Sequence, residues 1–359
     1  MKRVLTRYLM REILGSTVTV LLAFLGLFAF FDFVNELDSV GKDGYELHHA
    51  LIYVAMILPG RVYELLPVAV LIGTLYALTT LARHSEITVM RASGLSTLKM
   101  LRTLAGIGVI FVVATFVFGE YLAPPAERAA QQWRLTATNS KISSTLRSGL
   151  WVKDGPRFVN VQTVLPDRRM EKVRIYEFDE RHMLASVSDA ASGKYHADQR
   201  GWRLKGVRQT RFFGDHTEVV DLPELHWRSE LTPDVLSVLM VVPERMSVTT
   251  LFAYVSHLRE NQQNAERYEI ALWKKLVYPF AALVMMALAL PFAFNHDRMG
   301  GVSVKVFFGV MLGIGFHLLN GLFSNLGVIN GWYPALAALT PSLLFLIAAA
   351  GMLFWVERR

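Results

Sequence analysis

The stretch from Val306 to Val356 reads VFFGVMLGIGFHLLNGLFSNLGVINGWYPALAALTPSLLFLIAAAGMLFWV and contains no Asp, Glu, Lys or Arg over 51 residues. About 20 apolar residues in a helix are enough to cross the hydrocarbon of a bilayer. The run therefore has room for two crossings, and the Gly and Asn residues within 324–331 favour a bend between them. It predicts two transmembrane helices in succession.

Shorter charge-free runs predict the other spans, at 13–31, 65–82, 103–119 and 276–295. The first run follows four basic residues, as the apolar part of a secretory signal peptide would. It is longer than such a segment, however, and the residues at 32–36 contain no small-x-small cleavage site. We interpret it as a retained span, so the predicted fold is an α-helical polytopic membrane protein with six transmembrane helices.

Composition supports this class. The chain is 53% hydrophobic and only 19% charged, whereas soluble domains are about 25% charged. The net charge of +7 does not indicate a nucleic-acid partner, because Lys and Arg collect in the cytoplasmic loops of membrane proteins. The absence of cysteine excludes disulfides, thiolate catalysis and Cys-ligated zinc.

Basic residues gather on one side of the predicted spans. Four precede the first run, four lie between the second and third, and four more follow the fourth or the sixth: Lys2, Arg3, Arg7, Arg11, Arg83, Arg91, Lys99, Arg102, Arg298, Lys305, Arg358 and Arg359. The opposite short loops contain only Lys42 and Arg61. Both termini are therefore expected to be cytoplasmic.

The segment 124–269 is predicted to be a domain outside the cytoplasm, between a three-helix part at 1–123 and another at 270–359. Period-two patterning predicts strands at 158–164, 172–178 and 202–207. Turn residues separate them at 153–156, 165–167 and 199–201. This spacing is typical of a β-sandwich or jelly roll, so an all-β, jelly-roll-like domain is expected. Ser247 is expected to be the N-cap of a helix that returns the chain to the fourth span.

Motifs for catalysis are missing from the sequence. There is no G-x-x-x-x-G-K-[ST] loop to hold a nucleotide, and no H-E-x-x-H or G-x-S-x-G motif. Metal and cofactor sites are not predicted. His317 and Asn320 share one face of the fifth span, where hydrogen bonding between helices and a functional role are both open.

Polar residues flank the predicted outer ends of the spans. Asp32 follows the first span, and Arg61 and Glu64 precede the second. Ionisable groups at membrane depth usually face a cavity or a partner, although these residues could instead lie in the head-group zone. Three further basic residues could contact anionic groups or act as snorkelling anchors: Arg134, Lys274 and Lys275.

The loop between the second and third spans resembles a short capped helix within 83–97. Ser85 can cap it, Glu86 lies in its first turn and Gly94 can end it. A permease that docks on a separate ATPase needs such a helix, but an ordinary interfacial helix is the alternative.

Four strings in order resemble the lipopolysaccharide export permeases of the LptF/LptG family, and more the LptG branch than the LptF branch: SEITVMRASG at 85–94, GEYLAP at 119–124, GLWVKDG at 149–155, and Arg267-Tyr268 followed by Lys274. The resemblance covers the whole chain. It implies a permease that extracts lipopolysaccharide from the inner membrane.

The resemblance also implies partners: an LptF-like permease, an LptB-like ATPase dimer that uses the ATP, an LptC-like periplasmic protein and an LptA-like bridge. It assigns ATPase coupling to the helix after the second span, here Arg83, Ser85, Glu86, Met90, Arg91 and Gly94, with Glu86 as the acidic contact. Basic residues at the outer mouth bind the lipid head group in relatives, and Arg134 matches such a position. Asp32 stands where some LptG-type relatives carry a lysine, which departs from that pattern.

Two other function classes remain open from the sequence. A mechanotransmitting permease would relay ATP hydrolysis to a periplasmic partner without moving lipid through its spans. An intramembrane lipid-modifying enzyme would need an acid and base pair such as His317 with a carboxylate.

Overall fold

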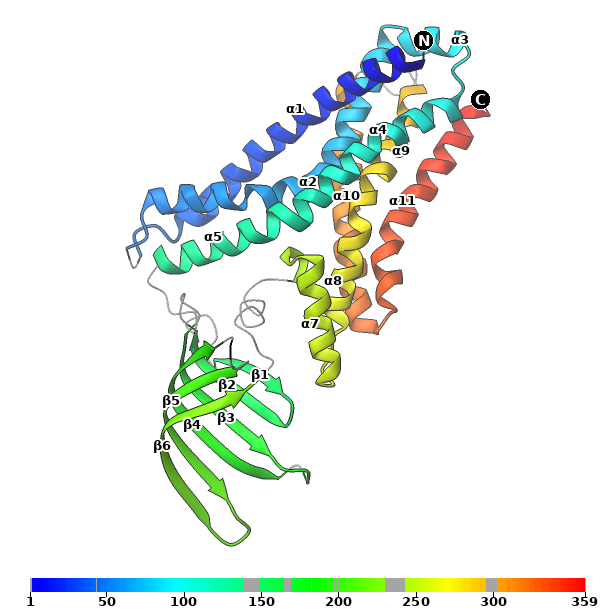
Figure 1. The fold of residues 1–359 in the computed structure, drawn as a ribbon. Helices are drawn as coiled ribbons and strands as arrows, with labels where there is room; N and C mark the ends of the chain where they lie inside the picture. Colours follow the sequence, from blue (N-terminus) through cyan, green and yellow to red (C-terminus); the bar gives the residue numbers. More distant parts are fainter. Residues whose placement is uncertain are drawn as a thin grey trace.

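The computed structural model describes residues 2–42, 44–137, 149–164, 169–181, 183–196, 198, 201–229, 243–294 and 302–358. A bundle of long helices has both chain termini at one end, and a curved β-sheet lies beyond the other end (Figure 1). We call these the terminal end and the sheet end. Two predicted turns, 165–167 and most of 199–201, and the basic residues Arg298 and Arg359 lie outside the described residues.

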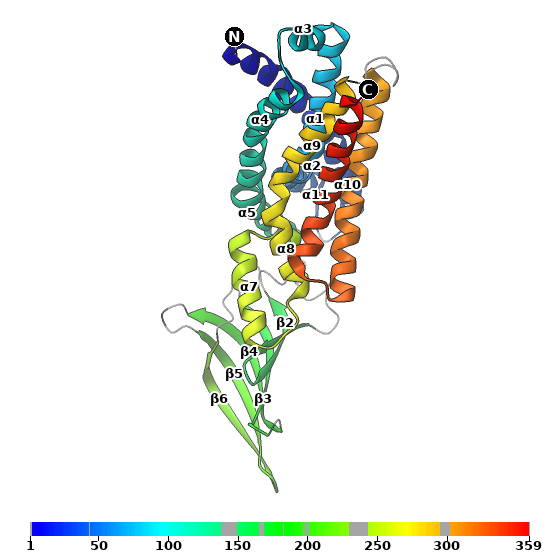
Figure 2. The same cartoon turned by 90° about the vertical axis from the view of Figure 1, so that its right-hand side faces the viewer.

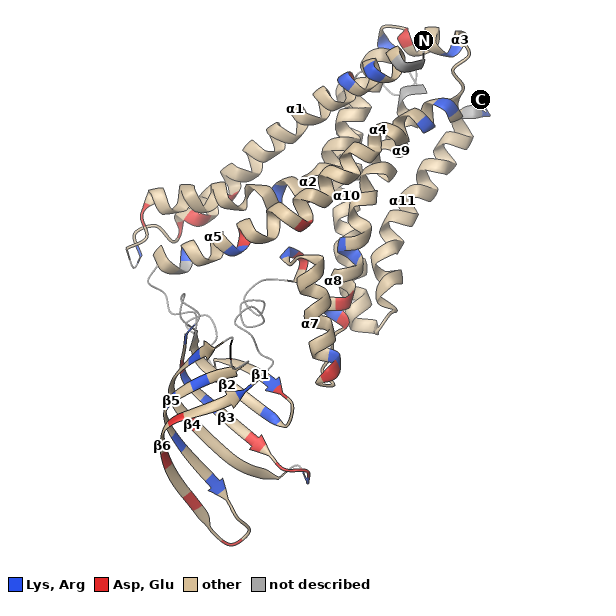
Figure 3. Ribbon diagram, in the orientation of Figure 1, with Lys and Arg blue, Asp and Glu red and all other residues tan. Residues whose placement is uncertain are grey.

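Six helical stretches of the described chain are long and apolar enough to cross a membrane, in agreement with the six spans predicted from the five charge-free runs. They are α1 (Lys2–Leu37), α2 (Leu47–Arg83), the joined α4 (Thr97–Val117), η1 (Phe118–Leu122) and α5 (Ala123–Ala137), the joined α8 (Glu266–Val277), η5 (Tyr278–Phe280) and α9 (Ala281–Phe294), α10 (Val302–Asn330), and α11 (Pro334–Glu357). The protein is thus a multi-pass membrane protein. Charged residues are sparse along the middle of these helices and gather towards the ends (Figure 3).

The second helix is the centre of the bundle. α2 packs against α1, α5, α9 and α10, and its Leu71, Leu75 and Leu78 are fully buried. Small residues allow close helix packing: a Cβ added at Gly73 would lie 2.5 Å from Thr17 of α1. Burial of this central helix accounts for most of the contacts that hold the bundle together.

The β-sheet lies in the middle of the chain and is fully antiparallel. Its strands are β1 (Leu150–Asp154), β2 (Arg157–Val164), β3 (Met170–Phe178), β4 (Leu184–His196), β5 (Gly201–Phe212) and β6 (Thr217–Arg228). The three predicted strands fall within β2, β3 and β5. The strands follow sequence order, as in a meander, so the described sheet does not itself show the Greek-key connections of a jelly roll.

The sheet is curled around its apolar face. Trp202 is fully buried there and stacks on Trp227, with ring centroids 6.5 Å apart. The Trp227 Nε1–H donates to Asp154 Oδ2 at 3.1 Å, so the outermost strands β1 and β6 approach each other at this point. The pairing register between β3 and β4 shifts between Glu177 and Phe178, and such a β-bulge bends a sheet.

Two helices link the sheet to α9: α7 (Val248–Glu260), and α8, which begins the fourth helical stretch. α7 follows a short turn, η4 (Pro243–Arg245), and α8 continues after a corner at 261–265. They lie between the bundle and the sheet (Figure 2). Ser247 is the N-cap of α7, as predicted, because its side chain accepts the Thr250 N–H at 3.1 Å.

The predicted bend at 324–331 is confirmed only at the last residue of that stretch. α10 continues to Asn330, and the chain turns at Gly331, where φ is 60°. The Trp332 N–H donates to the Gly327 carbonyl at 3.0 Å, as in a Schellman cap. Gly327 serves packing instead of bending, because a Cβ there would lie 2.8 Å from Ala337.

The β-structure also begins later than 124. Residues 123–137 form α5, which continues the third span in one helical stretch from Thr97 to Arg134. The joint between α4 and α5 is the single π-helical turn η1. Glu120, in η1, ends the charge-free run without ending the helix.

Candidate functional site

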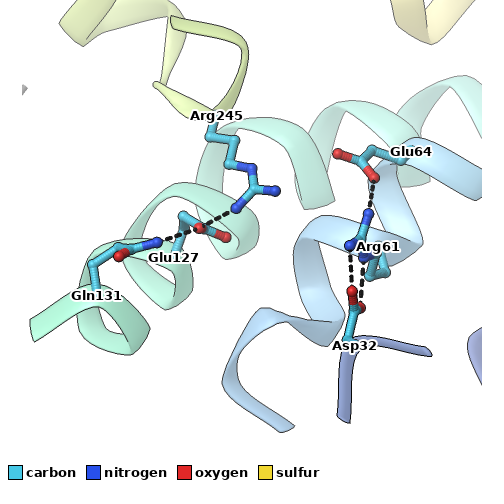
Figure 4. Close-up of polar contacts among 6 residues, drawn as sticks. All are labelled: Asp32, Arg61, Glu64, Glu127, Gln131 and Arg245. Carbon is cyan, nitrogen blue, oxygen red and sulfur yellow. Dashed lines mark hydrogen bonds and ion pairs between the residues drawn. The ribbon is translucent and has the colours of Figure 1, made fainter. Parts of the chain in front are cut away.

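A polar network joins α1 and α2 near the sheet end of the bundle (Figure 4). The Arg61 guanidinium donates from Nε to Asp32 Oδ2 at 2.8 Å and from Nη2 to Asp32 Oδ1 at 2.6 Å. It also donates to Glu64 Oε2 at 2.9 Å. The structure therefore brings together three of the residues predicted from the sequence, and pairs the cation fully with carboxylates.

A second ion pair lies beside this network. Arg245 of η4 donates to Glu127 Oε1 of α5 at 2.5 Å, and Gln131 donates to the same oxygen at 3.2 Å (Figure 4). The Glu127 side chain is only 6% exposed. This pair was not predicted from the sequence. The available signal was the spacing of Glu120 and Glu127, which are seven residues apart and therefore lie on one face of a helix.

A small cavity connects the two networks. Three carboxylates and three cations are among the residues that line it: Glu64, Glu127, Glu244, Arg61, Arg245 and Lys275. Their charges balance. An anionic head group would therefore have to exchange with these internal pairs, because the described lining has no excess of positive charge.

The three basic residues predicted to share one outer site do not meet. Lys275 is buried, and its ammonium donates to the Met246 carbonyl and lies 5.5 Å from the centre of the Tyr63 ring. Lys274 is half-buried. These contacts make Lys275 a structural anchor between α8 and the η4 segment.

Arg134 lies apart, near the far end of α5. Its Nε is 2.9 Å from Glu36 Oε1, and its guanidinium lies over the Tyr53 ring at 5.5 Å. Burial and the nearby Glu36 carboxylate raise the pKa of the Tyr45 hydroxyl above its ordinary range. Arg134 is thus paired within the chain, and its side chain is 40% exposed.

The short helix α3 (Glu86–Ala92) lies at the terminal end. Ile87 is buried in the cluster that contains Leu9 of α1 and Met100 of α4, and Met90 packs against that cluster. Val89 is 65% exposed, and Arg83 and Arg91 are exposed as well. α3 thus has an inner face anchored to the bundle and an outer face open to a partner.

The ends of α3 test the predicted caps. Gly94, with φ of 87°, follows the helix as predicted, and its N–H donates to the Arg91 carbonyl at 3.0 Å. The predicted N-cap is wrong: Ser85 has φ of 59° and its side chain makes no capping hydrogen bond. Only two residues join α2 to α3, and the left-handed conformation of Ser85 turns the chain within that link. The Glu86 carboxylate instead lies near the Tyr8 hydroxyl of α1.

His317 and Asn320 occupy α10 near the polar network. The His317 ring forms a hydrogen bond with the backbone of Glu64, whose carbonyl also accepts the Tyr278 hydroxyl at 2.6 Å. Asn320 donates to the Phe316 carbonyl of its own helix at 3.0 Å. His317 therefore bonds between helices, whereas Asn320 bonds within one.

Comparison with known proteins gives a consistent result. A family model described as "Lipopolysaccharide export system permease LptF/LptG" matches residues 7–356. The lipopolysaccharide export system permease protein LptG of Haemophilus influenzae is 32% identical over 355 residues, which cover 99% of this chain and 98% of that protein. The LptG protein of Escherichia coli K12 is 31% identical over 358 residues, 98% of each chain.

Proposed function

Because this chain belongs to the LptF/LptG family of lipopolysaccharide export permeases, we propose that it is the LptG-type subunit of a transporter that extracts lipopolysaccharide from the inner membrane. The chain is a transport subunit of the lipopolysaccharide export system. The observation that carries this conclusion is the family match over 7–356, which covers the helical bundle and the sheet together.

Extraction needs an external source of energy. Removing a lipid from the bilayer costs about 0.8 kcal/mol for each CH₂ exposed, and this chain has no P-loop motif. The proposed source is an LptB-like ATPase dimer that binds the exposed face of α3. Arg83, Ser85, Glu86, Arg91 and Gly94 are the proposed coupling residues, whereas Met90 helps to anchor the helix on the bundle.

The sidedness follows from the charges at the two ends. Basic residues at the terminal end support cytoplasmic termini and a periplasmic sheet in the inner membrane (Figure 3). An LptF-like permease completes the heterodimer. The outer strands β1 and β6 offer edges to which the β-domains of LptC-like and LptA-like proteins can add, and the curled sheet forms part of a jelly-roll-like domain.

The proposed lipid head-group site is the cavity at the sheet end. Arg61, Glu64 and Asp32 supply its paired charges, and Lys274 lies half-buried nearby on α8. Phosphate groups suit the planar fork of arginine, so Arg61 could exchange a carboxylate for a phosphate oxygen. Lys275 and Arg134 support the surrounding structure.

Photocrosslinking tests the proposed export. A photoreactive amino acid at Phe30, which is 60% exposed on α1, should form adducts with lipopolysaccharide in the assembled complex. One at Leu225, on the apolar face of β6, should form adducts only when ATP is hydrolysed. Leu346 of α11, 45% exposed, is the control for general contact with lipid. ATP hydrolysis without adducts at Phe30 or Leu225 above this control would favour the mechanotransmitting alternative.

A further inference from the structure

The turn between β1 and β2 is docked on the corner between α7 and α8. The Gly155 N–H donates to Asn261 Oδ1 at 2.9 Å, and the Lys153 ammonium donates to the Asn261 carbonyl at 3.2 Å. Gly155 has φ of 59°, which suits glycine. Asp154, the residue between them, accepts the Trp227 N–H from β6. This one turn therefore connects Asn261 to both edges of the curled sheet.

The corner that carries Asn261 belongs to a compact helical hairpin. Asn261 caps α7, and its Nδ2 donates to the His257 carbonyl at 2.9 Å. Arg259 of α7 is 2.7 Å from Glu269 of α8, and the Tyr254 and Tyr268 rings meet edge to face with centroids 4.6 Å apart. Burial raises the pKa of the Tyr254 hydroxyl, in agreement with a dry interface. The two helices should move as one unit.

The opposite end of the hairpin is fixed to the membrane helices. Glu120, in the π-helical turn η1, accepts the Val248 N–H at 2.7 Å and so caps α7 from another helix. Arg245 is paired with Glu127, and the Met246 carbonyl accepts the Lys275 ammonium. Arg245 and Met246 before Ser247, and Val248 after it, are thereby tied to α5, α8 and η1.

We propose that the α7–α8 hairpin is a rigid bridge that sets the orientation of the sheet over the membrane helices, with Asn261 as its positioning residue at the sheet. The bridge is fixed at one end to the β1–β2 turn and at the other to Glu120 and Glu127. Lipid that leaves the helices then meets the apolar face of the sheet in a constant orientation. This consequence rests on the proposed export function, whereas the orientation itself does not.

Distances between spin labels test the bridge directly. The natural chain has no cysteine, so Gln132→Cys on α5 and Glu218→Cys on β6 supply the only labelling sites, both exposed. Pulsed electron paramagnetic resonance on the full chain in its purified complex then reports the distance between bundle and sheet. Asn261→Ala should broaden this distribution, since loss of one hydrogen bond lowers the docked population roughly two- to tenfold.

Two variants make the test specific. Gln262→Ala changes the exposed neighbouring side chain and should leave the distribution narrow. Asn261→Asp keeps an acceptor for the Gly155 N–H and should therefore give the narrow distance distribution of the unmodified residue. An unchanged distribution in Asn261→Ala would overturn the proposal, and so would equal broadening in Gln262→Ala or in Asn261→Asp.

The membrane end has its own test. Glu127→Arg and Arg245→Glu should each broaden the same distribution, and the double variant should narrow it again because the pair is re-formed with exchanged charges. Broadening that persists in the double variant would contradict the role of this pair. Lipopolysaccharide transfer is measured separately on every variant. If neither the unmodified protein nor any variant transfers lipopolysaccharide, the proposed export function is wrong. The distance measurements still show whether the bridge orients the sheet.

Discussion

Asp32 on α1 accepts two hydrogen bonds from Arg61 on α2, at 2.8 and 2.6 Å, so the first span is fixed to the most buried helix by a planar ion pair. The Asp32 side chain is 13% exposed and the Arg61 side chain 21%. Within this single chain, only 11% of the apolar window of α1 is buried. The pair therefore holds α1 near the sheet end, whereas Leu9 and the close contact of Thr17 with Gly73 hold it nearer the terminal end.

Removal of Asp32 should destabilise this arrangement. Asp32→Ala is expected to lower the free energy of unfolding by about 2 kcal/mol, because a largely buried guanidinium loses two charged acceptors. The thermal unfolding midpoint of the purified protein in detergent measures the change. The double variant Asp32→Ala with Arg61→Leu should recover part of the loss. Equal midpoints for Asp32→Ala and the unmodified protein would contradict this role.

Gly119 should tolerate no side chain. A Cβ at this position would lie 2.5 Å from the Tyr63 ring, so Gly119→Ala should cost about 1–3 kcal/mol through overpacking. Gly106 in the same stretch has nothing within 4 Å of its added Cβ. Gly106→Ala is the matched control and should be neutral or slightly stabilising in the same unfolding assay, since alanine favours helix.

Two serines that precede helices should behave differently. Ser247→Ala should cost about 1 kcal/mol, because it removes the acceptor of the Thr250 N–H. Ser85→Ala should change stability little, since Ser85 makes no capping hydrogen bond. Thermal unfolding of the two variants side by side gives the comparison. A larger loss in Ser85→Ala than in Ser247→Ala would contradict the structure.

Charge reversal on α3 should release the ATPase. Glu86→Lys is expected to remove the ATPase subunit from the purified complex, because the proposed coupling helix would lose its proposed acidic contact. Glu12→Lys makes the same change of charge at an exposed site on α1 and is the control. Co-purified ATPase and ATP turnover are the measurements, and an intact, active Glu86→Lys complex would exclude this contact.

The adjacent lysines of α8 should separate structure from lipid binding. Lys275→Gln should lower the unfolding midpoint, corresponding to about 1–2 kcal/mol, because the buried contact with the Met246 carbonyl is weakened. Lys274→Gln should leave the midpoint unchanged and reduce lipopolysaccharide-stimulated ATPase activity. If Lys274→Gln has normal lipid stimulation, Lys274 is an interfacial anchor only.

Much of the fold could be predicted from local patterns. Absence of charge identified six spans, and alternation identified β2, β3 and β5. The same criterion ended the third helical stretch too early, since the chain stays helical past Glu120, whose carboxylate accepts the Val248 N–H. A charged residue marks the end of a helix in the sequence only where water solvates its side chain. Where another part of the chain pairs with the charge, the helix can continue.

The site was less predictable because its partners are distant in sequence. Arg61 and Glu64 are three apart and were identified together, but Glu127 and Arg245 are 118 residues apart. Ser85 shows a different limit. Its residue type suits an N-cap, yet its conformation is set by the short link between two packed helices. Side-chain chemistry alone does not contain that information.

The third helical stretch is much longer than the hydrocarbon of a bilayer is thick. Its 38 residues, at 1.5 Å each, extend about 57 Å, nearly twice the thickness of about 30 Å of bilayer hydrocarbon. Nearly half of it must therefore stand in water or in the head-group layer, like a spacer. A four-residue insertion after Ala123 would add about 6 Å to this spacer. The length of this helical stretch thus contributes to the distance over which an extracted lipid must be shielded from water.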